Sequence, residues 1–377
     1  MSEFNIISKI YKGIDIYNNG KEYSPKEGER QNFVQNKMMK FFKKISDSIF
    51  FSSDNKGLVY YLEFSKEKNT FKISNLNNIC NDSKYILVDI IKSNKYDCYF
   101  SLDLNPCLNI FEIKENNNKK EIEVIQHINL KRSKENQNKT KYNKILEINT
   151  PNNDCFVLFA DNIIELWFNN NKNNIINYEF IQSLKIDNIN NANIINNDFV
   201  DSNIISNIYK SDDENLVLLN ISKFQIINAK ISEIKSEKNN NNIIPILELK
   251  NKTNIKTIEG QIEKISSLFM NKDYIFLGLI DSLVLISIKY GEIIQTYQIG
   301  KVVQMKLTND KNYIYIFVDR GENKYCFIKY KFIEYQGLIE EKRLEYKEWI
   351  YKFDIIESLN IIIIYNIKGL VTLLSFD

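Results

Sequence analysis

"DYIFLGLIDSLVLISIKYGEIIQTYQIG", residues 273–300, consists of three short runs rich in β-branched and aromatic residues. An amphipathic helix would instead place apolar residues at i, i+3, i+4 and i+7 over about ten positions or more. Each run has the length and composition of a β-strand. Asp281-Ser282 can turn the chain because both side chains hydrogen-bond nearby backbone, and Gly291 marks the next turn. The stretch therefore predicts three consecutive antiparallel strands.

The C-terminal run "LNIIIIYNIKGLVTLLSF" (359–376) has about the minimum length of a membrane-spanning helix. Asn360, Asn366, Lys368 and Gly369 interrupt it, and a central lysine is unfavourable in hydrocarbon. We therefore expect two further strands here, and no contact with a membrane.

The pattern of the opening stretch recurs along the chain as a polar residue, an apolar run, a short break and a second apolar run. Seven copies occur, at 47–64, 97–114, 154–169, 214–230, 273–290, 312–330 and 357–376. By subtraction, their starts lie 39 to 60 residues apart. A period of this size built from short strands is typical of β-propeller blades.

A blade has four strands, here called a to d from the centre of the ring outwards. The two runs of each copy fit strands b and c, because these are covered on both faces by neighbouring blades. Leading a strands are predicted at 86–91, 144–150, 263–270, 301–308 and 348–354. Trailing d strands are predicted at 70–76, 121–130, 178–186, 243–249, 292–299 and 341–347.

The last copy lacks a trailing strand, whereas a spare strand, "EFNIISKIY" (3–11), precedes the first copy. Pairing the two would remove unpaired sheet edges, which invite aggregation. The sequence therefore predicts an all-β fold: a seven-bladed β-propeller closed by an N-terminal strand that completes the last blade. The expected blades are 33–76, 84–130, 144–186, 200–250, 262–299, 300–347, and 348–377 plus 3–11. Polar segments at 129–141, 187–212 and 231–242 are expected to be inter-blade linkers.

"DNIIELWF" (161–168) resembles the strand of WD40 repeats that ends in Trp-Asp, with Trp167 at the tryptophan position and Phe168 in place of aspartate. "DNKGLVYYLEF" (54–64) and "IKGLVTLLSF" (367–376) are similar to the same turn and strand. The chain thus resembles the WD40 and YVTN-type β-propeller families. This resemblance implies a non-catalytic scaffold for protein–protein interactions within a multi-subunit assembly.

The chain departs from WD40 repeats in two ways. It has one histidine, His127, and no Trp-Asp dipeptide. The buried Asp–His–Ser/Thr–Trp network of those repeats therefore cannot form in its usual arrangement. Ring closure and packing of β-branched side chains are expected to hold the blades together instead.

Residues 265–297 and 331–338 are similar to the non-catalytic propeller subunit of the tRNA guanine-N7 methyltransferase. That similarity implies an alternative function, as an RNA-associated subunit of a tRNA-modifying or ribosome-biogenesis complex. RNA would then be contacted through a partner enzyme.

Charge and cysteine content indicate an intracellular protein without a general affinity for polyanions. The 377 residues contain 50 Lys and Arg against 48 Asp and Glu, a formal charge of +2, so any nucleic-acid contact requires a local patch. The five cysteines show no Cys-x-x-Cys spacing, and no secretory signal is visible. We expect reduced thiols and a cytoplasmic or nuclear location.

Motifs for catalysis, metals or cofactors are not evident. One histidine and five scattered cysteines offer no metal-ligand set, and 11 glycines form no phosphate-binding loop. Cys98 and Cys107 are expected in the core, and His127 on a blade surface. Neither an enzyme activity nor a cofactor is predicted. A propeller enzyme would instead show convergent carboxylates in a polar central channel.

The best candidate for an interaction patch is "NKMMKFFKK" (36–44). Lysines and phenylalanines alternate there in a mixture that suits an acidic partner or nucleic acid. The patch comprises Lys37, Lys40, Phe41, Phe42, Lys43 and Lys44. The same pattern also fits the a strand of the first blade, with phenylalanines in the core and lysines outside. The sequence does not identify the partner protein.

Overall fold

The computed structural model of the protein describes most of the chain. The described residues are 10–15, 21–23, 39–54, 57–68, 70–76, 86–104, 107–116, 119–130, 142–160, 163–170, 176–185, 205–210, 215–220, 225–236, 239–255, 265–270, 273–310, 312–322, 324–334, 336–365 and 370–375. Within them the chain forms strands β1 to β29 and one turn of 3-10 helix, η4 (Glu357–Leu359). None of the helical structure described is long and apolar enough to cross a membrane.

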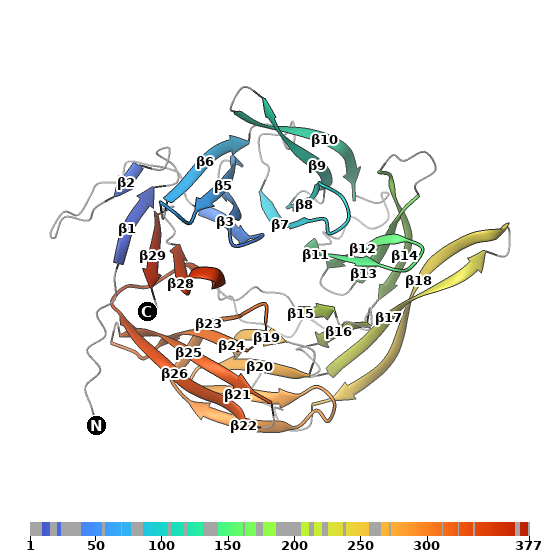
Figure 1. Ribbon diagram of the computed structural model, residues 1–377. Coiled ribbons are helices and arrows are strands. Elements are labelled where there is room, and N and C mark those ends of the chain that lie inside the picture. The colour runs from blue at the N-terminus through green and yellow to red at the C-terminus, as the bar shows by residue number, and fades with distance from the viewer. Residues whose placement is uncertain are drawn as a thin grey trace.

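The strands of the described residues form seven antiparallel sheets arranged in a ring (Figure 1). The first sheet contains β3 (Met39–Lys44), β4 (Ile49–Asp54), β5 (Val59–Ser65) and β6 (Thr70–Leu76). The second contains β7 (Leu87–Lys92), β8 (Tyr99–Asp103), β9 (Cys107–Asn116) and β10 (Lys119–Asn129). The third contains β11 (Tyr142–Asn149), β12 (Asp154–Ala160), β13 (Ile163–Asn169) and β14 (Tyr178–Lys185).

The remaining sheets continue round the ring. The fourth contains β15 (Ile205–Lys210), β16 (Asn215–Asn220), β17 (Gln225–Ser236) and β18 (Asn239–Asn254). The fifth contains β19 (Ile265–Met270), β20 (Tyr274–Leu279), β21 (Ser282–Ser287) and β22 (Ile293–Gln298). The sixth contains β23 (Lys301–Leu307), β24 (Tyr313–Asp319), β25 (Tyr325–Ile333) and β26 (Gly337–Tyr346). The seventh contains β27 (Lys352–Ile356), β28 (Ile361–Tyr365), β29 (Leu370–Ser375), β1 (Ile10–Asp15) and β2 (Lys21–Tyr23).

The predicted all-β propeller architecture is confirmed by this arrangement. Residues 273–300 form strands b, c and d of the fifth sheet, as expected; these are β20, β21 and β22. Every residue of β21 is buried, because the sheet is covered on both sides. Gly291, in the turn before β22, has a φ of +67°, which favours glycine.

The described N-terminal strand, β1, continues four residues beyond the end of the predicted range, to Asp15. β1 pairs with β29, so that Ile10 faces Leu374 and Asp15 faces Leu370. The prediction placed this strand at residues 3–11, and residues 3–9 lie outside the described part of the chain. The inner strand β27 also contacts β3, which places the seventh sheet beside the first.

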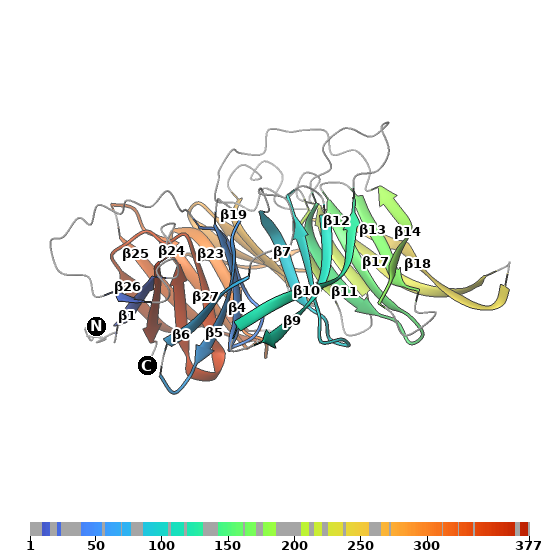
Figure 2. The same cartoon turned by 90° about the horizontal axis from the view of Figure 1, so that it is seen from above.

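Two of the expected linkers contain strands instead. The expected linker 187–212 includes β15, whose sequence "ISNIYK" has too few apolar residues to stand out. The expected linker 231–242 belongs largely to the long hairpin β17–β18, which extends away from the ring (Figure 2). Ile231 of this hairpin is only 2% exposed, because it packs against the third sheet. The described residues of the expected linker 129–141 are the end of β10 and Leu130; residues 131–141 lie outside the described part.

The hydrophobic core is a series of clusters, each between two neighbouring sheets. At the junction of the seventh and first sheets, Phe42 stacks on Tyr365 with ring centroids 3.6 Å apart. At the junction of the fifth and sixth sheets, Gly278 lies so close to Val302 that a Cβ atom would sit 2.6 Å from its Cγ1. Inner strands of the first six sheets share a break in register near their starts, a β-bulge that increases local twist.

Candidate functional site

The sequence-predicted patch lies on β3 and is mostly built into the ring. Phe41 and Phe42 are 9% and 0% exposed, so neither can contact a partner. Lys43 forms an ion pair with Asp89 of the second sheet. Lys44 bonds to the carbonyl of Ile355 in the seventh sheet and also pairs with Asp47 at 2.8 Å.

Lys40 is the described member of the patch that remains exposed, whereas Lys37 lies outside the described residues. The structure thus favours the interpretation of residues 39–44 as an inner strand. A binding role for the patch stays a prediction.

Of the two cysteines expected in the core, Cys98 lies there, whereas Cys107 does not, because it is the first residue of β9 and follows a turn; His127 lies on a blade surface as expected. Cys98 is fully buried, and burial raises the pKa of its thiol to about 12, so it is protonated at neutral pH. Cys107 is half-buried, and His127 is exposed on β10 with its Nδ1 2.5 Å from Oδ1 of Asn109. Among the described residues, no three potential metal ligands gather at one place.

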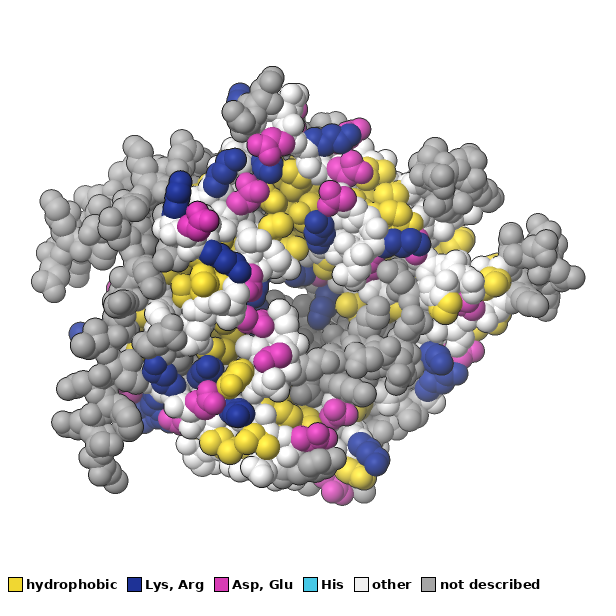
Figure 3. All heavy atoms as spheres, viewed as in Figure 1, with side chains coloured by type: hydrophobic (Ala, Val, Ile, Leu, Met, Phe, Trp, Pro, Cys, Tyr) yellow, Lys and Arg dark blue, Asp and Glu magenta, His cyan; other side chains and the backbone are white. Residues whose placement is uncertain are grey.

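The two faces of the ring differ in the contacts that their side chains make. One face carries the turns between strands a and b and between c and d, and is called the a–b face. The opposite face carries the turns between b and c and the d-to-a connections, and is called the b–c face. On the side shown in Figure 3, positive and negative side chains are interleaved around a central hollow.

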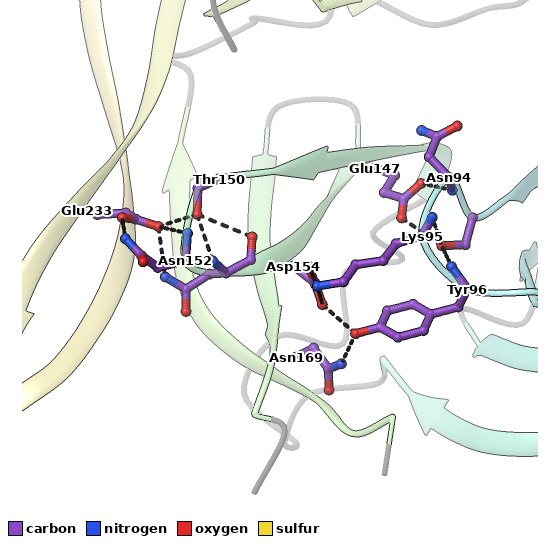
Figure 4. Close-up of polar contacts among 11 residues, drawn as sticks. Asn94, Lys95, Tyr96, Glu147, Thr150, Asn152, Asp154, Asn169 and Glu233 are labelled. Carbon is purple, nitrogen blue, oxygen red and sulfur yellow. Dashed lines mark hydrogen bonds and ion pairs between the residues drawn. The ribbon is translucent and has the colours of Figure 1, made fainter. Parts of the chain in front are cut away.

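On the a–b face, Glu147 of β11 holds the turn of the neighbouring second sheet (Figure 4). Its two carboxylate oxygens accept the hydroxyl of Ser93 at 2.7 Å and the backbone N–H of Asn94 at 2.6 Å. Asp154 accepts the Nζ of Lys95 at 2.7 Å and the hydroxyl of Tyr96 in the same turn. Bonds to a charged acceptor are stronger than neutral ones, so they fix the second sheet to the third.

The fourth sheet holds the third in the same way. Glu233 of β17 accepts the backbone N–H of Asn152 at 3.1 Å, and the side chains of Thr150, Asn152 and Asn153 also donate to it (Figure 4). Burial acts to raise the pKa of Glu233, but these hydrogen bonds outweigh burial and lower it. The carboxylate is therefore favoured in the folded protein.

The motif recurs on the other side of the ring. Asp47 in the first sheet accepts the N–H of Ser358 in the seventh at 2.9 Å. Glu357 in the seventh accepts the N–H of Asn309 in the sixth at 3.0 Å. Four junctions thus share a carboxylate from one sheet that binds a turn N–H of the preceding sheet, and we call these contacts carboxylate clasps.

Glutamine side chains form a second kind of link between sheets. Gln126 donates to the carbonyl of Tyr178 at 3.1 Å and accepts its N–H at 2.9 Å. Gln182 binds Leu247 in the same two-bond way, and Gln304 binds Phe353. Each of these glutamines directly follows a β-bulge, which directs its side chain towards the next sheet.

These glutamine clasps were missed by sequence reasoning, although a signal existed. Four tripeptides of the described residues have an Ile or Val directly before a glutamine, and this Ile or Val is the extra residue of a β-bulge, without an opposite residue in the neighbouring strand. They are "VIQ" (124–126), "FIQ" (180–182), "IIQ" (293–295) and "VVQ" (302–304). The expectation that closure and packing alone hold the blades is therefore incomplete.

Trp167, which marks the resemblance to WD40 repeats, belongs to a different polar network. Its Nε1 donates to Glu165 at 3.2 Å, and the hydroxyl of Tyr142 donates to the same carboxylate at 2.9 Å. Glu165 is only 3% exposed. A buried glutamate thus links strands a and c of the third sheet without a histidine.

The b–c face, in contrast, has a shallow open depression of about 370 Å³ between the fifth and sixth sheets. Its lining residues come from three turns: Ile280, Asp281, Gly300, Lys301, Asp319, Arg320 and Gly321. Asp319 accepts the N–H of Gly321 at 2.8 Å, and Gly300 donates its N–H to the carbonyl of Asp281 at 3.1 Å. Gly300 and Gly321 have φ values of +100° and +80°, which ordinary residues adopt only with strain.

Apolar side chains are exposed around this depression and further along the b–c face. Ile280 at its edge is 53% exposed, and Leu104 in the b–c turn of the second sheet is 55% exposed. Trp349 is 39% exposed and packs edge-on against Tyr325, on the other side of the b–c turn of the sixth sheet. The face therefore combines apolar contacts with both signs of charge.

Solved structures resemble this chain over most of its length. The C-terminal WD40 domain of Sif2 has a TM-score of 0.55 and 10% identity, and the match covers 92% of this chain and 98% of that domain. Saccharomyces cerevisiae Sqt1 has a TM-score of 0.51 and 10% identity, over 88% of this chain and 82% of that one. A protein from Lactobacillus plantarum has a TM-score of 0.52 and 8% identity, over 79% and 82%.

Sequence comparison adds nothing to this, since no protein-family model and no curated protein matches the chain. The finer resemblance to a tRNA methyltransferase subunit stays a prediction. Identities of this size establish the fold alone: the chain is an all-β propeller that shares the architecture of WD40 domains.

Proposed function

We propose that the protein is a non-catalytic scaffold, in the cytoplasm or nucleus, that binds partner proteins of a multi-subunit assembly through its b–c face. The difference between the two faces carries this proposal. Polar groups of the a–b face join neighbouring sheets, and that face also exposes Tyr290, whereas three large apolar side chains, those of Leu104, Ile280 and Trp349, are exposed on the b–c face. Exposed apolar side chains among polar ones are typical of interfaces, and tryptophan is enriched where binding energy concentrates.

A non-catalytic role is supported by the carboxylates of the described inner strands. Asp89 pairs with Lys43 and accepts the N–H of Ile145 at 2.9 Å. Asp354 pairs with Lys306 at 3.3 Å, and Glu147 holds a turn. These carboxylates lie on separate sheets with their own structural partners, and a propeller enzyme would need them to converge on a substrate.

The alternative, an RNA-associated subunit, is supported by the basic character of the inner strands. They contain nine lysines and three acidic residues. Salt-dependent RNA binding by the purified protein would be required of that role.

The test is affinity purification from the cells that make the protein, with identification of the co-purifying chains. Ile280→Glu places a charge on the b–c face, and Tyr290→Glu places the same charge on the a–b face, at a residue that is 59% exposed. We expect Ile280→Glu to lose chains that both the wild type and Tyr290→Glu retain. Equal retention by both variants, or loss with Tyr290→Glu alone, would contradict the proposal.

A further inference from the structure

The outer part of the hairpin β17–β18 has only two strands. β17 and β18 have 12 and 16 residues, whereas β15 and β16 of the same sheet have six each. β16 pairs with β17 from Gln225 to Lys230, so among the described strands only β18 pairs with residues 231–236 (Figure 2). We call residues 231–236 and 239–247 the arm. A two-stranded ribbon is marginally stable in water and needs a further layer packed on it.

One face of the arm already packs against such a layer. Ile231 and Leu247 lie opposite each other and belong to the apolar cluster of the third sheet. Glu233 binds the N–H of Asn152 in a turn of the same sheet. Side chains alternate between the two faces of a strand, so these three residues point towards the third sheet. This face is therefore covered within the molecule.

The opposite face of the arm is apolar and open to solvent. Ile234 lies opposite Ile244, and Ser232 lies opposite Ile246. By the same alternation, all four side chains point away from the third sheet. Ile234 is 47% exposed, and Ile244 and Ile246 are half-buried. We call these three isoleucines the isoleucine face.

The edge of the arm does not suit the addition of another strand. Gln182 binds both the N–H and the carbonyl of Leu247, at 2.9 and 3.2 Å, on the outer edge of β18. Pro245 lies two residues earlier on the same edge and has no N–H to donate. A proline at a strand edge hinders pairing with a further strand. A partner would therefore bind the side chains of the isoleucine face.

Positive charge lies at the root of the isoleucine face, where the arm joins the ring. Lys230 is exposed and lies opposite Glu248 on this side of the hairpin. The carboxylate of Glu248 already accepts the Nζ of Lys250 at 2.5 Å. Two lysines thus accompany one carboxylate, and a complementary partner would bring an acidic side chain to this end.

The spacing of these side chains matches one stripe of an α-helix. Neighbouring side chains on one face of a strand are about 6.6 Å apart, because each residue advances about 3.3 Å. Helical residues four apart are separated by about 6 Å, because each advances about 1.5 Å. Ile234 and Ile246 lie at successive levels of the ribbon, so they can contact helical positions i and i+4. Lys230 lies one level beyond Ile246, which corresponds to about position i+8.

We propose that the arm binds an amphipathic helix of a partner protein, with apolar residues on the isoleucine face and an acidic residue beside Lys230. This inference goes beyond the proposed function, because it adds a binding surface outside the b–c face. The helix would supply the missing layer on the open side of the ribbon. Apolar burial would provide most of the affinity, and the charge at one end would set the direction of the helix.

A second copy of the chain complements the isoleucine face less well. In a two-fold pair of arms, the root of each arm would face the tip of the other. The tip sequence "KSEKNNNN" (235–242) contains two lysines and one glutamate. An excess of positive charge would then face the lysines of the root, which disfavours this pairing.

The experiment is a fluorescence-anisotropy titration of the full chain with two labelled, alanine-based helical peptides. The acidic peptide carries leucines at positions i and i+4 and glutamates one turn further on, and the basic peptide has lysines in place of the glutamates. We expect the wild type to bind the acidic peptide about fivefold more tightly than the basic one.

Two pairs of substitutions test the isoleucine face. Ile234→Ser combined with Ile244→Ser should weaken binding of the acidic peptide about tenfold. The control pair, Ile293→Ser with Ile294→Ser, changes two exposed isoleucines of β22 and should leave binding unchanged. Thermal unfolding of each variant checks that it folds. Equal weakening by both pairs, or no binding of either peptide by the wild type, would overturn the inference.

Charge reversal tests the root of the arm. Lys230→Glu should abolish the preference for the acidic peptide, whereas Lys66→Glu, at an exposed lysine of the turn after β5, should retain it. Equal binding of the two peptides by the wild type would contradict the predicted direction. A dimer that light scattering detects in the wild type but not in the Ile234→Ser, Ile244→Ser variant would assign the isoleucine face to a second copy and overturn the inference.

Failure of the arm and failure of the b–c face can be told apart. Ile280→Glu should leave binding of the acidic peptide unchanged. If Ile280→Glu loses the peptide and the Ile234→Ser, Ile244→Ser variant retains it, the arm inference falls and the proposed function stands. If the peptide depends on the arm while Ile280→Glu retains every co-purifying chain, the arm inference stands without the proposed b–c interface.

Discussion

Two junctions between neighbouring sheets differ in the contacts that join them: the one between the second and third sheets, and the one between the fifth and sixth. At the first, Glu147, Gln126 and Asp89 bind backbone groups of the neighbouring sheet. At the second, Phe276 and Leu285 pack directly on Val302 and its neighbours, and Gly278 allows close approach. The comparison shows that an apolar layer joins the sheets at both junctions, with charged hydrogen bonds added at the first and closer apolar packing at the second.

The two junctions should therefore respond to different perturbations. An apolar junction is sensitive to added volume, because its atoms are already in contact. A clasped junction is sensitive to the loss of an acceptor, because its turn N–H groups then lose a charged hydrogen-bond partner. A change of pH should affect the clasps far more than the apolar layer.

The largest effect is expected from Gly278→Val at the apolar junction. Its Cβ would sit 2.6 Å from the Cγ1 of Val302. Such overpacking should lower the free energy of unfolding by about 3 kcal/mol or more in urea denaturation. Gly321→Ala is the control: nothing lies within 4 Å of its added Cβ, and its φ of +80° leaves only backbone strain, about 1 kcal/mol. A loss below that of the control would show that the junction is not tightly packed.

At the clasped junction, Glu147→Ala should lower the free energy of unfolding by about 2 kcal/mol. The Ser93 hydroxyl and the Asn94 N–H lose their acceptor, and Glu147 itself is only 5% exposed. Glu121→Ala, at an exposed position of β10, should change stability by less than about 0.5 kcal/mol. Similar values for the two variants in urea denaturation would contradict the clasp.

Gln182→Ala tests the glutamine clasps and should have a smaller effect, about 1 to 2 kcal/mol. It removes two hydrogen bonds to the backbone of Leu247, at 2.9 and 3.2 Å. Gln298→Ala on the exposed strand β22 serves as the matched control. Chemical denaturation measures both, and the prediction fails if the control is destabilised as much as Gln182→Ala.

The pH dependence should be the mildest effect. Burial acts to raise the pKa of Asp47, but hydrogen bonds from Lys44 and Ser358 outweigh it and lower the pKa from 3.8 to about 2. A lowered pKa means that this clasp stabilises the fold above about pH 4, where the unfolded carboxyl is ionised. That contribution is lost as the pH falls from about 4 to about 2.

Asp47→Asn should accordingly flatten the acid limb of the stability curve, measured by urea denaturation between pH 6 and pH 2. Gly278→Val should lower the whole curve without changing its slope, because no titrating group is involved. An unchanged acid limb in Asp47→Asn would show that Asp47 does not contribute to the loss of stability at low pH.

Much of the fold could be predicted from the sequence, because strands b and c are covered on both faces and therefore read as continuous apolar runs. The six residues of β21 are an example. Strand β15, "ISNIYK", was not predicted, because polar residues surround it in the sequence. An inner strand has one edge along the channel and therefore needs fewer apolar side chains. The length of β18 was underestimated because asparagine and lysine dominate its ends.

The site was harder to predict, because its residues meet only in three dimensions. Phe41 and Phe42 suggested a binding patch, but their alternation with lysine is that of a buried strand. The sequence placed the turn at Asp281-Ser282, one residue late, because Ser282 already begins β21. The proximity of this turn to Lys301 and Arg320 depends on how two sheets are placed side by side. The bulge tripeptides ending in glutamine could have been found, since three of the four lie on outer d strands, β10, β14 and β22.

The central claim, that one face binds and the other joins the sheets, is tested most directly by site-specific photo-crosslinking. The photoreactive residue p-benzoylphenylalanine is placed at position 280 or at position 290, two exposed positions on opposite faces of the fifth sheet. We predict that irradiation in cells yields a discrete crosslinked partner from position 280 and none from position 290. A partner captured at position 290 and absent at position 280 would contradict the account.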